Sequence, residues 1–164
     1  MNIALIAALL AVPATSPIGH SSEGSTGQLK AKLLIVDDVD AFWKAWEGPT
    51  PPHIATTSTV TLKRPVYAMI VFGGCAPAAD GNCNLSVTYR IVAPNGSQYD
   101  EPVSGEAWKG PPAPVPNLQA SLASIGFRLE PQDALGDYVI QAELTDGVAI
   151  SKLTISEIVT AKGN

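Results

Sequence analysis

Charged and aromatic residues are scarce in this 164-residue chain, at 15% and 6% of the sequence. The 10 basic residues are outnumbered by 15 acidic ones, and they are scattered singly except for Lys63-Arg64. A protein without a cluster of Lys or Arg lacks the electrostatic attraction on which binding to nucleic acid or to an anionic membrane surface depends. The composition therefore argues against both partners.

Histidine is scarcer still, with only His20 and His53 in the chain. A serine hydrolase needs a nucleophile held beside a base, and the sequence contains no G-x-S-x-G turn that would expose one. His53 is the only histidine inside the expected fold, and it lies in a proline-rich stretch. We therefore expect no catalytic residues, and a hydrolase built on this chain is a minor alternative.

Acidic residues occur close together at two places, Asp37-Asp38 with Asp40 and Asp80 with Asn82. Paired carboxylates can hydrolyse glycosides or bind calcium. However, acids just ahead of a helix usually cap it, and neither group has the spacing of a calcium-binding loop. The sequence predicts no metal site and no cofactor.

The chain has only two cysteines, Cys75 and Cys83. Zinc sites usually need four ligands in close pairs, and thioredoxin-like redox sites have two intervening residues, whereas seven residues separate this pair. Both cysteines lie at the facing ends of two predicted strands, where Cα atoms of opposed residues are about 4.5 to 5.5 Å apart. We therefore expect a disulfide in preference to free thiols, in an oxidising compartment.

Long apolar runs are missing except near the N-terminus, from Ile3 to Val12. This run is too short for a transmembrane helix, which needs about 20 apolar residues. It is typical of a secretory signal peptide over residues 1–14, cleaved after Ala14, although a frayed apolar N-terminus is the alternative. The polar residues 15–28 read as a flexible linker, and 29–164 as a single domain. We expect a periplasmic or secreted protein with no membrane-spanning segment in the mature chain.

Glycine and proline are plentiful, with 14 of each, which favours a turn-rich β protein. Apolar residues alternate with polar ones over 85–91 and 138–144, as in half-buried strands, and 66–72 is apolar on both faces, as in a central strand. Further strands are expected at QLKAKLLIV, STVTLKR, SQYDEP, ASIGFRLEP and VAISKLTISEIVTA. The sequence therefore predicts an all-β sandwich, with a long loop over 103–117.

One segment, DDVDAFWKAWEGPTPP, has the pattern of a short helix. Asp38 or Asp40 can cap its start, Phe42 and Trp46 share one face, and Gly48 ends it. We expect two helical turns that pack over the sandwich, with Trp46 and Phe42 closing its open end.

The stretch from Asp133 to Tyr138 resembles the D-x-x-G-x-Y pattern that begins the penultimate strand of immunoglobulin-like and fibronectin-like sandwiches. This resemblance implies a tyrosine corner formed by Asp133, Gly136 and Tyr138. The whole chain also resembles small bacterial periplasmic or secreted proteins with a G-C-x(7)-C hairpin. With the seven or eight strands and the one short helix predicted above, the Asp133–Tyr138 resemblance implies an immunoglobulin-like antiparallel β-sandwich.

Three tryptophans lie in segments predicted to be outside the strands, at Trp43, Trp46 and Trp108. We expect a non-catalytic exported module for protein binding or envelope assembly, which presents its loops and the Trp43 surface to a protein partner. An alternative is a carbohydrate-binding module that stacks sugars on Trp43 and Trp108. The other functional alternative is a hydrolase or inhibitor built on the sandwich. For Trp108, the structural alternative is that its side chain pins the long loop over 103–117.

Overall fold

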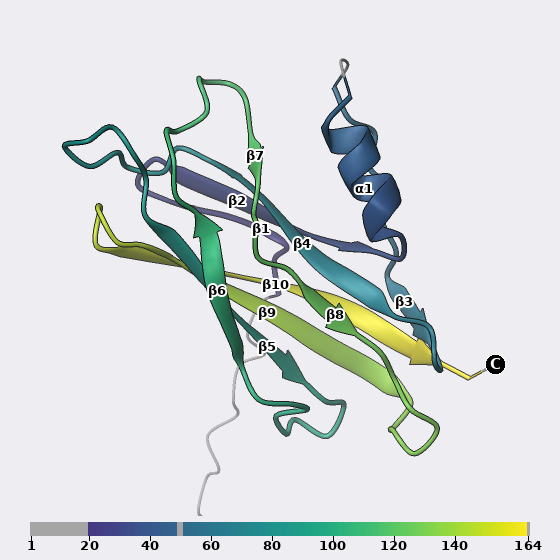
Figure 1. Cartoon of the computed structure of the whole chain (residues 1–164). Coiled ribbons are helices and arrows are strands. Elements are labelled where there is room, and N and C mark those ends of the chain that lie inside the picture. The colour runs from purple at the N-terminus through teal and green to yellow at the C-terminus, as the bar shows by residue number, and fades with distance from the viewer. Residues whose placement is uncertain (1–19, 49–50, 164) are drawn as a thin grey trace, which may run out of the picture.

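The residues that the structure describes fold into ten strands and one helix, with the strands arranged as two packed sheets (Figure 1). The computed structural model describes residues 20–48 and 51–163. The strands are β1 (Glu23–Thr26), β2 (Leu29–Val36), β3 (Thr59–Thr61), β4 (Val66–Gly73), β5 (Leu85–Val92), β6 (Val103–Trp108), β7 (Gln119–Ala120), β8 (Ile125–Phe127), β9 (Gly136–Asp146) and β10 (Ser151–Lys162). The helix is α1 (Val39–Trp46).

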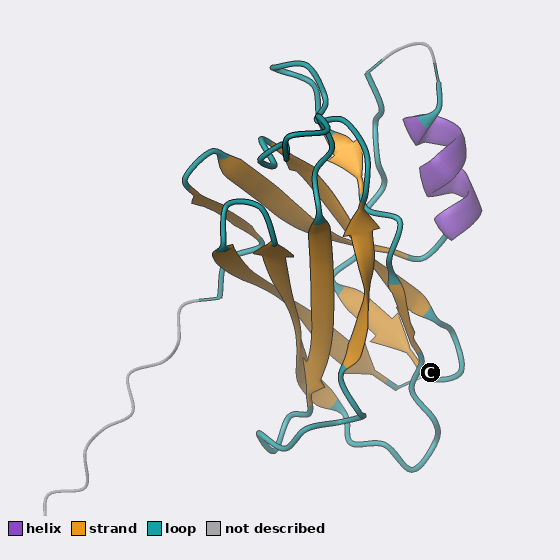
Figure 2. Cartoon of the chain, turned by 60° about the vertical axis from the view of Figure 1, so that its left-hand side comes forward, coloured by secondary structure: helices purple, strands orange, loops and turns teal. Residues whose placement is uncertain are grey.

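The two sheets have the topology of an immunoglobulin-like sandwich. One sheet has the order β1-β2-β4-β7, with β8 also paired to β4, and the other has the order β3-β10-β9-β5-β6. All strand pairs are antiparallel except β3 with β10. The neighbours β5, β9 and β10 correspond to strands C, F and G of that fold. Figure 2 shows the sheets face to face, with the helix outside them.

The core between the sheets follows from the alternation of apolar residues along the strands. On β5 and β9 the inward side chains are buried and the outward ones are more exposed, as the two-residue period of a strand requires. β4 is buried on both faces, as predicted, because the second sheet covers one face and α1 the other. Its inward residues include Ala68, Ile70 and Phe72.

The helix begins and ends close to where the sequence predicted. The Asp38 side chain caps it, since its Oδ1 accepts a hydrogen bond from the Ala41 backbone N–H at 2.8 Å. Phe42 is buried against Leu34, Val36 and other residues on the outer face of the first sheet. The helix therefore covers part of a sheet face and does not close the open end of the sandwich, which corrects our expectation for Phe42 and Trp46.

The part of the predicted linker that the structure describes is not a linker. β1 pairs with β2 and packs against β10, where a Cβ added to Gly24 would lie 2.9 Å from Leu153 Cδ1. Any larger residue at position 24 would therefore require the Leu153 and Ile155 side chains to shift. The fold thus begins before residue 29. Sequence reasoning missed this polar edge strand because it is held by backbone pairing and has no apolar alternation. Residues 1–14, the predicted signal peptide, lie outside the described residues.

Two further expectations differ from the structure. The SQYDEP segment is not a strand and makes only an isolated bridge, between Gln98 and Val92. The next strand is β6, which lies inside the stretch predicted to be a long loop. Four of the six β6 residues, Ser104 to Ala107, are polar or small, so the strand lacks the apolar alternation by which strands are recognised. With β1, β6 and the two-residue β7, the strand count rises from seven or eight to ten.

Within the residues that the structure describes, no helix has the length and apolar character needed to cross a membrane.

Candidate functional site at the disulfide end

Three loops meet at one end of the sandwich, which we call the disulfide end: residues 74–84 between β4 and β5, 109–118 between β6 and β7, and 147–150 between β9 and β10 (Figure 1). Strands ending side by side in both sheets bring together loops that are far apart in sequence. Loops held on a rigid β scaffold are frequent binding surfaces.

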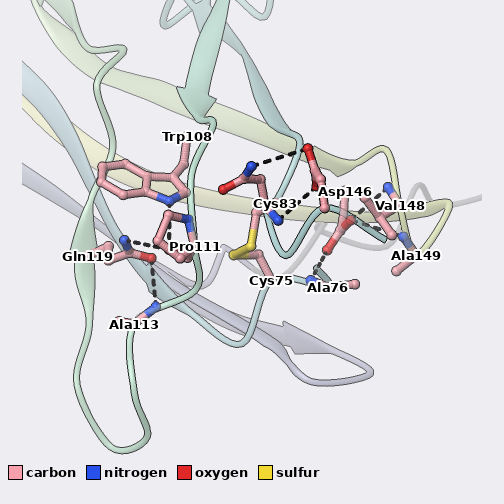
Figure 3. The surroundings of a disulfide bond; sticks show 12 residues. Cys75, Ala76, Cys83, Trp108, Pro111, Ala113, Gln119, Asp146, Val148 and Ala149 are labelled. Carbon is pink, nitrogen blue, oxygen red and sulfur yellow. Dashed lines mark hydrogen bonds between the residues drawn. A yellow bond between two sulfur atoms is a disulfide. The ribbon is translucent and has the colours of Figure 1, made fainter. Parts of the chain in front are cut away.

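The predicted disulfide between Cys75 and Cys83 is confirmed, with its Cα atoms 5.9 Å apart (Figure 3). Both cysteines are buried at the edge of the core. The loop that the bond closes is folded on itself, because the Ala78 N–H donates to Asn82 O at 2.8 Å and the Gly81 N–H donates to Ala78 O at 2.9 Å. The first loop therefore has a covalent base and a hydrogen-bonded tip.

Asp146 is the main polar residue of this end, and its side chain is buried. Its Oδ1 accepts hydrogen bonds from the backbone N–H groups of Val148 and Ala149, each at 3.0 Å. Its Oδ2 accepts one from the Ala76 N–H at 2.8 Å. One side chain thus shapes the β9–β10 turn and ties it to the disulfide loop.

Asp80 forms a smaller, exposed hydrogen-bonded turn within the disulfide loop. Its Oδ1 accepts from the Asn82 backbone N–H at 3.0 Å, and its Oδ2 accepts from the Asn82 side-chain amide at 3.2 Å. The backbone hydrogen bond from Asn82 is the main reason that the pKa of Asp80 is lowered. The pair therefore rigidifies the loop.

The second loop, residues 109–118, is braced by Trp108 and Gln119 (Figure 3). Trp108 is half-buried, with its ring 6.5 Å from that of Phe72, and its Nε1–H donates to Pro111 O at 3.1 Å. The Gln119 side chain accepts from the Ala113 N–H at 3.2 Å and donates to Pro111 O at 3.4 Å. Trp108 therefore fastens the loop to the core.

Backbone hydrogen bonds join the three loops to one another. The Cys83 N–H donates to Gly110 O at 2.7 Å, which links the first loop to the second. The Gly147 N–H donates to Asn84 O at 2.9 Å, which links the third to the first. The disulfide end is thus one connected unit.

The tips of two of these loops expose apolar side chains. Val115 and Ile150 are each 91% exposed. Ile150 also has a φ of 54°, in the left-handed region that β-branched residues rarely occupy. A hollow of about 460 Å³ opens at the base of the 147–150 loop, lined in part by Gln28, Pro77 and Ala149.

The other tryptophan predicted to bind, Trp43, lies elsewhere, on α1. It is half-buried, and its ring stands edge-on to Phe42 with 5.2 Å between ring centroids. Trp43 and Trp108 therefore belong to different parts of the molecule, one on the helix outside the first sheet and one at the disulfide end. The structure does not bring them together as a common stacking platform.

The histidines also lie apart from the disulfide end. His53 is exposed and shares a hollow of about 100 Å³ with Asp37 and Asp38. His20 Nδ1 lies 3.1 Å from Ser156 Oγ, a contact hidden from sequence reasoning because His20 fell in the predicted linker. In the described part of the chain, no three His, Cys, Asp or Glu residues are grouped so as to hold a metal ion.

The residues of the predicted tyrosine corner lie at the end of the sandwich opposite the disulfide. The Tyr138 hydroxyl donates to Ala134 O at 2.8 Å. Asp133 Oδ2 accepts from the Glu130 N–H at 2.7 Å and from the Tyr99 hydroxyl at 2.6 Å. These contacts fix the turn that leads into β9.

The comparisons with known proteins give no family. No family model matches the chain, and no curated protein matches its sequence. Among solved structures, a family 123 glycoside hydrolase from Clostridium perfringens aligns with 84% of this chain at a TM-score of 0.47 and 11% identity. This chain spans only 28% of that hydrolase.

A second solved structure is the CARDB domain of a Pyrococcus furiosus protein, in complex with di-metal ions. It aligns at a TM-score of 0.39 and 13% identity, over 84% of this chain and 97% of that one. Both scores are below 0.5, so we base no functional argument on either likeness. The disulfide end described above is the candidate site that the chain's own geometry supports.

Proposed function

We propose that this protein is a non-catalytic binding module of an oxidising, extracytoplasmic compartment, and that its disulfide end binds a protein partner. The proposal depends chiefly on one observation: the exposed apolar side chains Val115 and Ile150 stand on loops that a disulfide, Asp146 and Trp108 hold in place.

Braced loops favour binding because they lose little conformational entropy when a partner docks. Ordering a flexible loop costs free energy that subtracts from the affinity, whereas a preorganised loop avoids that cost. Here the three loops are joined by the Cys83–Gly110, Asn84–Gly147 and Ala76–Asp146 hydrogen bonds. The surface is therefore suited to recognition without rearrangement.

The exposed apolar tips favour a protein partner over a sugar or a nucleic acid. Aliphatic side chains such as Val115 and Ile150 gain free energy when an apolar surface covers them. A sugar site would instead present the face of an aromatic ring, but the Trp108 indole at this end packs beside Phe72 and donates to Pro111. This chemistry supports a protein surface as the ligand.

The disulfide and the predicted signal peptide support the proposed compartment. Disulfides persist in secreted and periplasmic proteins and are rare in the cytosol. The Cys75–Cys83 bond, together with the apolar pattern of residues 3–12, supports export.

Site-specific photo-cross-linking in the cells that make the protein tests this proposal. A benzophenone amino acid is placed at Val115 or Ile150, and, as a control, at Leu135, which is 55% exposed at the opposite end. We expect a discrete protein adduct from positions 115 and 150, and none of that mass from 135. Adducts that are absent at both tips, or the same at all three positions, would overturn the proposal.

A further inference from the structure

The outer face of the first sheet is only partly covered by α1. Phe42 of the helix packs on Leu34, Val36 and Met69, but the helix does not cover the neighbouring part of the sheet, where Lys30 and Lys32 of β2 point outward. Helices that pack on a sheet normally bury its apolar outer face. The uncovered part is a surface different from the tips of the disulfide end.

Two adjoining hollows run along this part of the sheet. One has a volume of about 530 Å³ and is bordered by β1, Lys30 and Lys32. The other has a volume of about 700 Å³ and is bordered by Trp46, Pro52 and Leu34. Both are lined by Val71 and Leu118, so they adjoin at these two residues, and we call the two hollows together the α1 groove.

The walls of the α1 groove are apolar and fixed. Trp46 stacks on the buried Phe42 ring, with 5.8 Å between ring centroids and 9° between ring planes. On the other side stands Leu118, which is 49% exposed and packs against Gly73, where an added Cβ would lie 3.1 Å from Leu118 Cδ2. A large apolar side chain that remains half exposed beside a hollow is available to a ligand.

One end of the groove carries an uncompensated positive charge. Lys32 pairs with Glu23 of β1, whereas Lys30, two residues earlier on the same face, has no salt bridge to any residue that the structure describes. A ligand lying in the groove therefore meets an apolar floor followed by a cation. Complementary charge favours a carboxylate on the ligand at that end.

We propose that the α1 groove binds an extended, apolar peptide segment of a partner protein, which carries a carboxylate beside Lys30. Side chains of an extended peptide alternate in direction, so every second one can enter a hollow while the backbone passes Leu118. Asn117, which lines the larger hollow, supplies an amide able to bond a peptide backbone. The proposal does not depend on the role given above to Val115 and Ile150, although Asn117 and Leu118 belong to the same 109–118 loop as Val115.

Selection from a displayed library of random heptapeptides with free carboxyl termini tests the proposal. The baits are the wild-type protein, Leu118→Asp, Lys30→Gln and a control, Leu122→Asp, whose leucine is 59% exposed but does not line the groove. Far-UV circular dichroism checks that each bait is folded.

We expect peptides with alternating apolar residues and an acidic group to be enriched on the wild type and to change Trp46 emission when they bind. Their affinity should fall about 10-fold or more on Leu118→Asp, because a buried apolar anchor is lost. It should fall only about 3-fold on Lys30→Gln, which removes one exposed ion pair. Changing the acidic peptide residue to its amide should abolish the difference between wild type and Lys30→Gln.

Three results would overturn the proposal. The first is a selection in which no peptide is enriched more on the wild-type bait than on the Leu118→Asp bait. The second is enriched peptides that bind Leu118→Asp and Leu122→Asp equally. The third is a wild-type dimer in sedimentation equilibrium that Leu118→Asp dissociates, which would assign the groove to a second copy of the chain.

Discussion

The side chain of Asp146 holds the backbone of Ala76, with its Oδ2 accepting from the Ala76 N–H at 2.8 Å although the residues are 70 apart in sequence. Asp146 ends β9 and Ala76 follows the first cysteine of the disulfide, so this bond joins two loops that come from different sheets. It is the contact on which the shape of the disulfide end most depends.

Replacing Asp146 with Ala should lower the free energy of unfolding by about 1 to 3 kcal/mol, because three backbone N–H groups lose their acceptor. Asp146→Asn keeps one side-chain oxygen and should cost less. The measurement is urea denaturation of both variants. The control is Asp37→Ala, an exposed acid, which should leave stability within about 0.5 kcal/mol; a loss as large as that of Asp146→Ala would contradict the assignment.

Removing the disulfide should destabilise the protein by about 2 to 3 kcal/mol, the value expected from the chain entropy of so short a loop. The variant replaces Cys75 and Cys83 together with Ala, so that no free thiol remains. Urea midpoints of the variant and of the reduced wild type are compared with the oxidised wild type. Equal midpoints in all three would mean that the bond adds no stability.

Replacing Tyr138 with Phe should cost about 0.5 to 1.5 kcal/mol, since it removes only the hydroxyl that donates to Ala134 O. The ring remains packed 5.1 Å from that of Phe127. A matched control is Tyr67→Phe on the half-buried outer face of β4, which should be nearly neutral. If the two variants have the same free energy of unfolding, the Tyr138 hydroxyl contributes nothing to stability.

Stability should fall in alkali because of Tyr89, whose hydroxyl is buried and donates to Ala123 O at 3.0 Å. Burial raises the pKa of this hydroxyl above that of an unfolded tyrosine. The unfolded chain therefore loses the proton first, so the stabilising contribution is complete below about pH 10 and declines by about 1.4 kcal/mol per pH unit above it.

Urea denaturation at intervals between about pH 8 and pH 11 tests this dependence. In Tyr89→Phe, the free energy of unfolding should decline less steeply above about pH 10, with a slope smaller by about 1.4 kcal/mol per pH unit, the contribution of one proton. An unchanged slope in the variant would show that Tyr89 is not responsible.

The sequence was enough to predict the parts of the fold that repeat a simple pattern. The alternation over β5 and β9, the doubly apolar β4 and the capped helix all appear in the structure where expected. So does the disulfide, because facing strand ends place Cys75 and Cys83 at a bonding distance.

The remaining elements depend on contacts between segments distant in sequence. β1 and β6 are polar edge strands that only their pairing partners define, and β7 is two residues long. The role of Asp146 depends on a loop 70 residues away, so its neighbours in the sequence, Thr145 and Gly147, could not reveal it. The helix pattern likewise predicted an apolar face but not which surface of the sandwich would receive it.

The central claim is that the loops of the disulfide end are held rigid before any partner binds, and amide hydrogen exchange of the wild-type protein tests it most directly. The Ala76 and Val148 amides, which donate to Asp146, and the Cys83 amide, which donates to Gly110 O, should exchange slowly and remain protected on the timescale of hours. Rapid exchange of these amides, at the rate of an unstructured peptide, would contradict the claim.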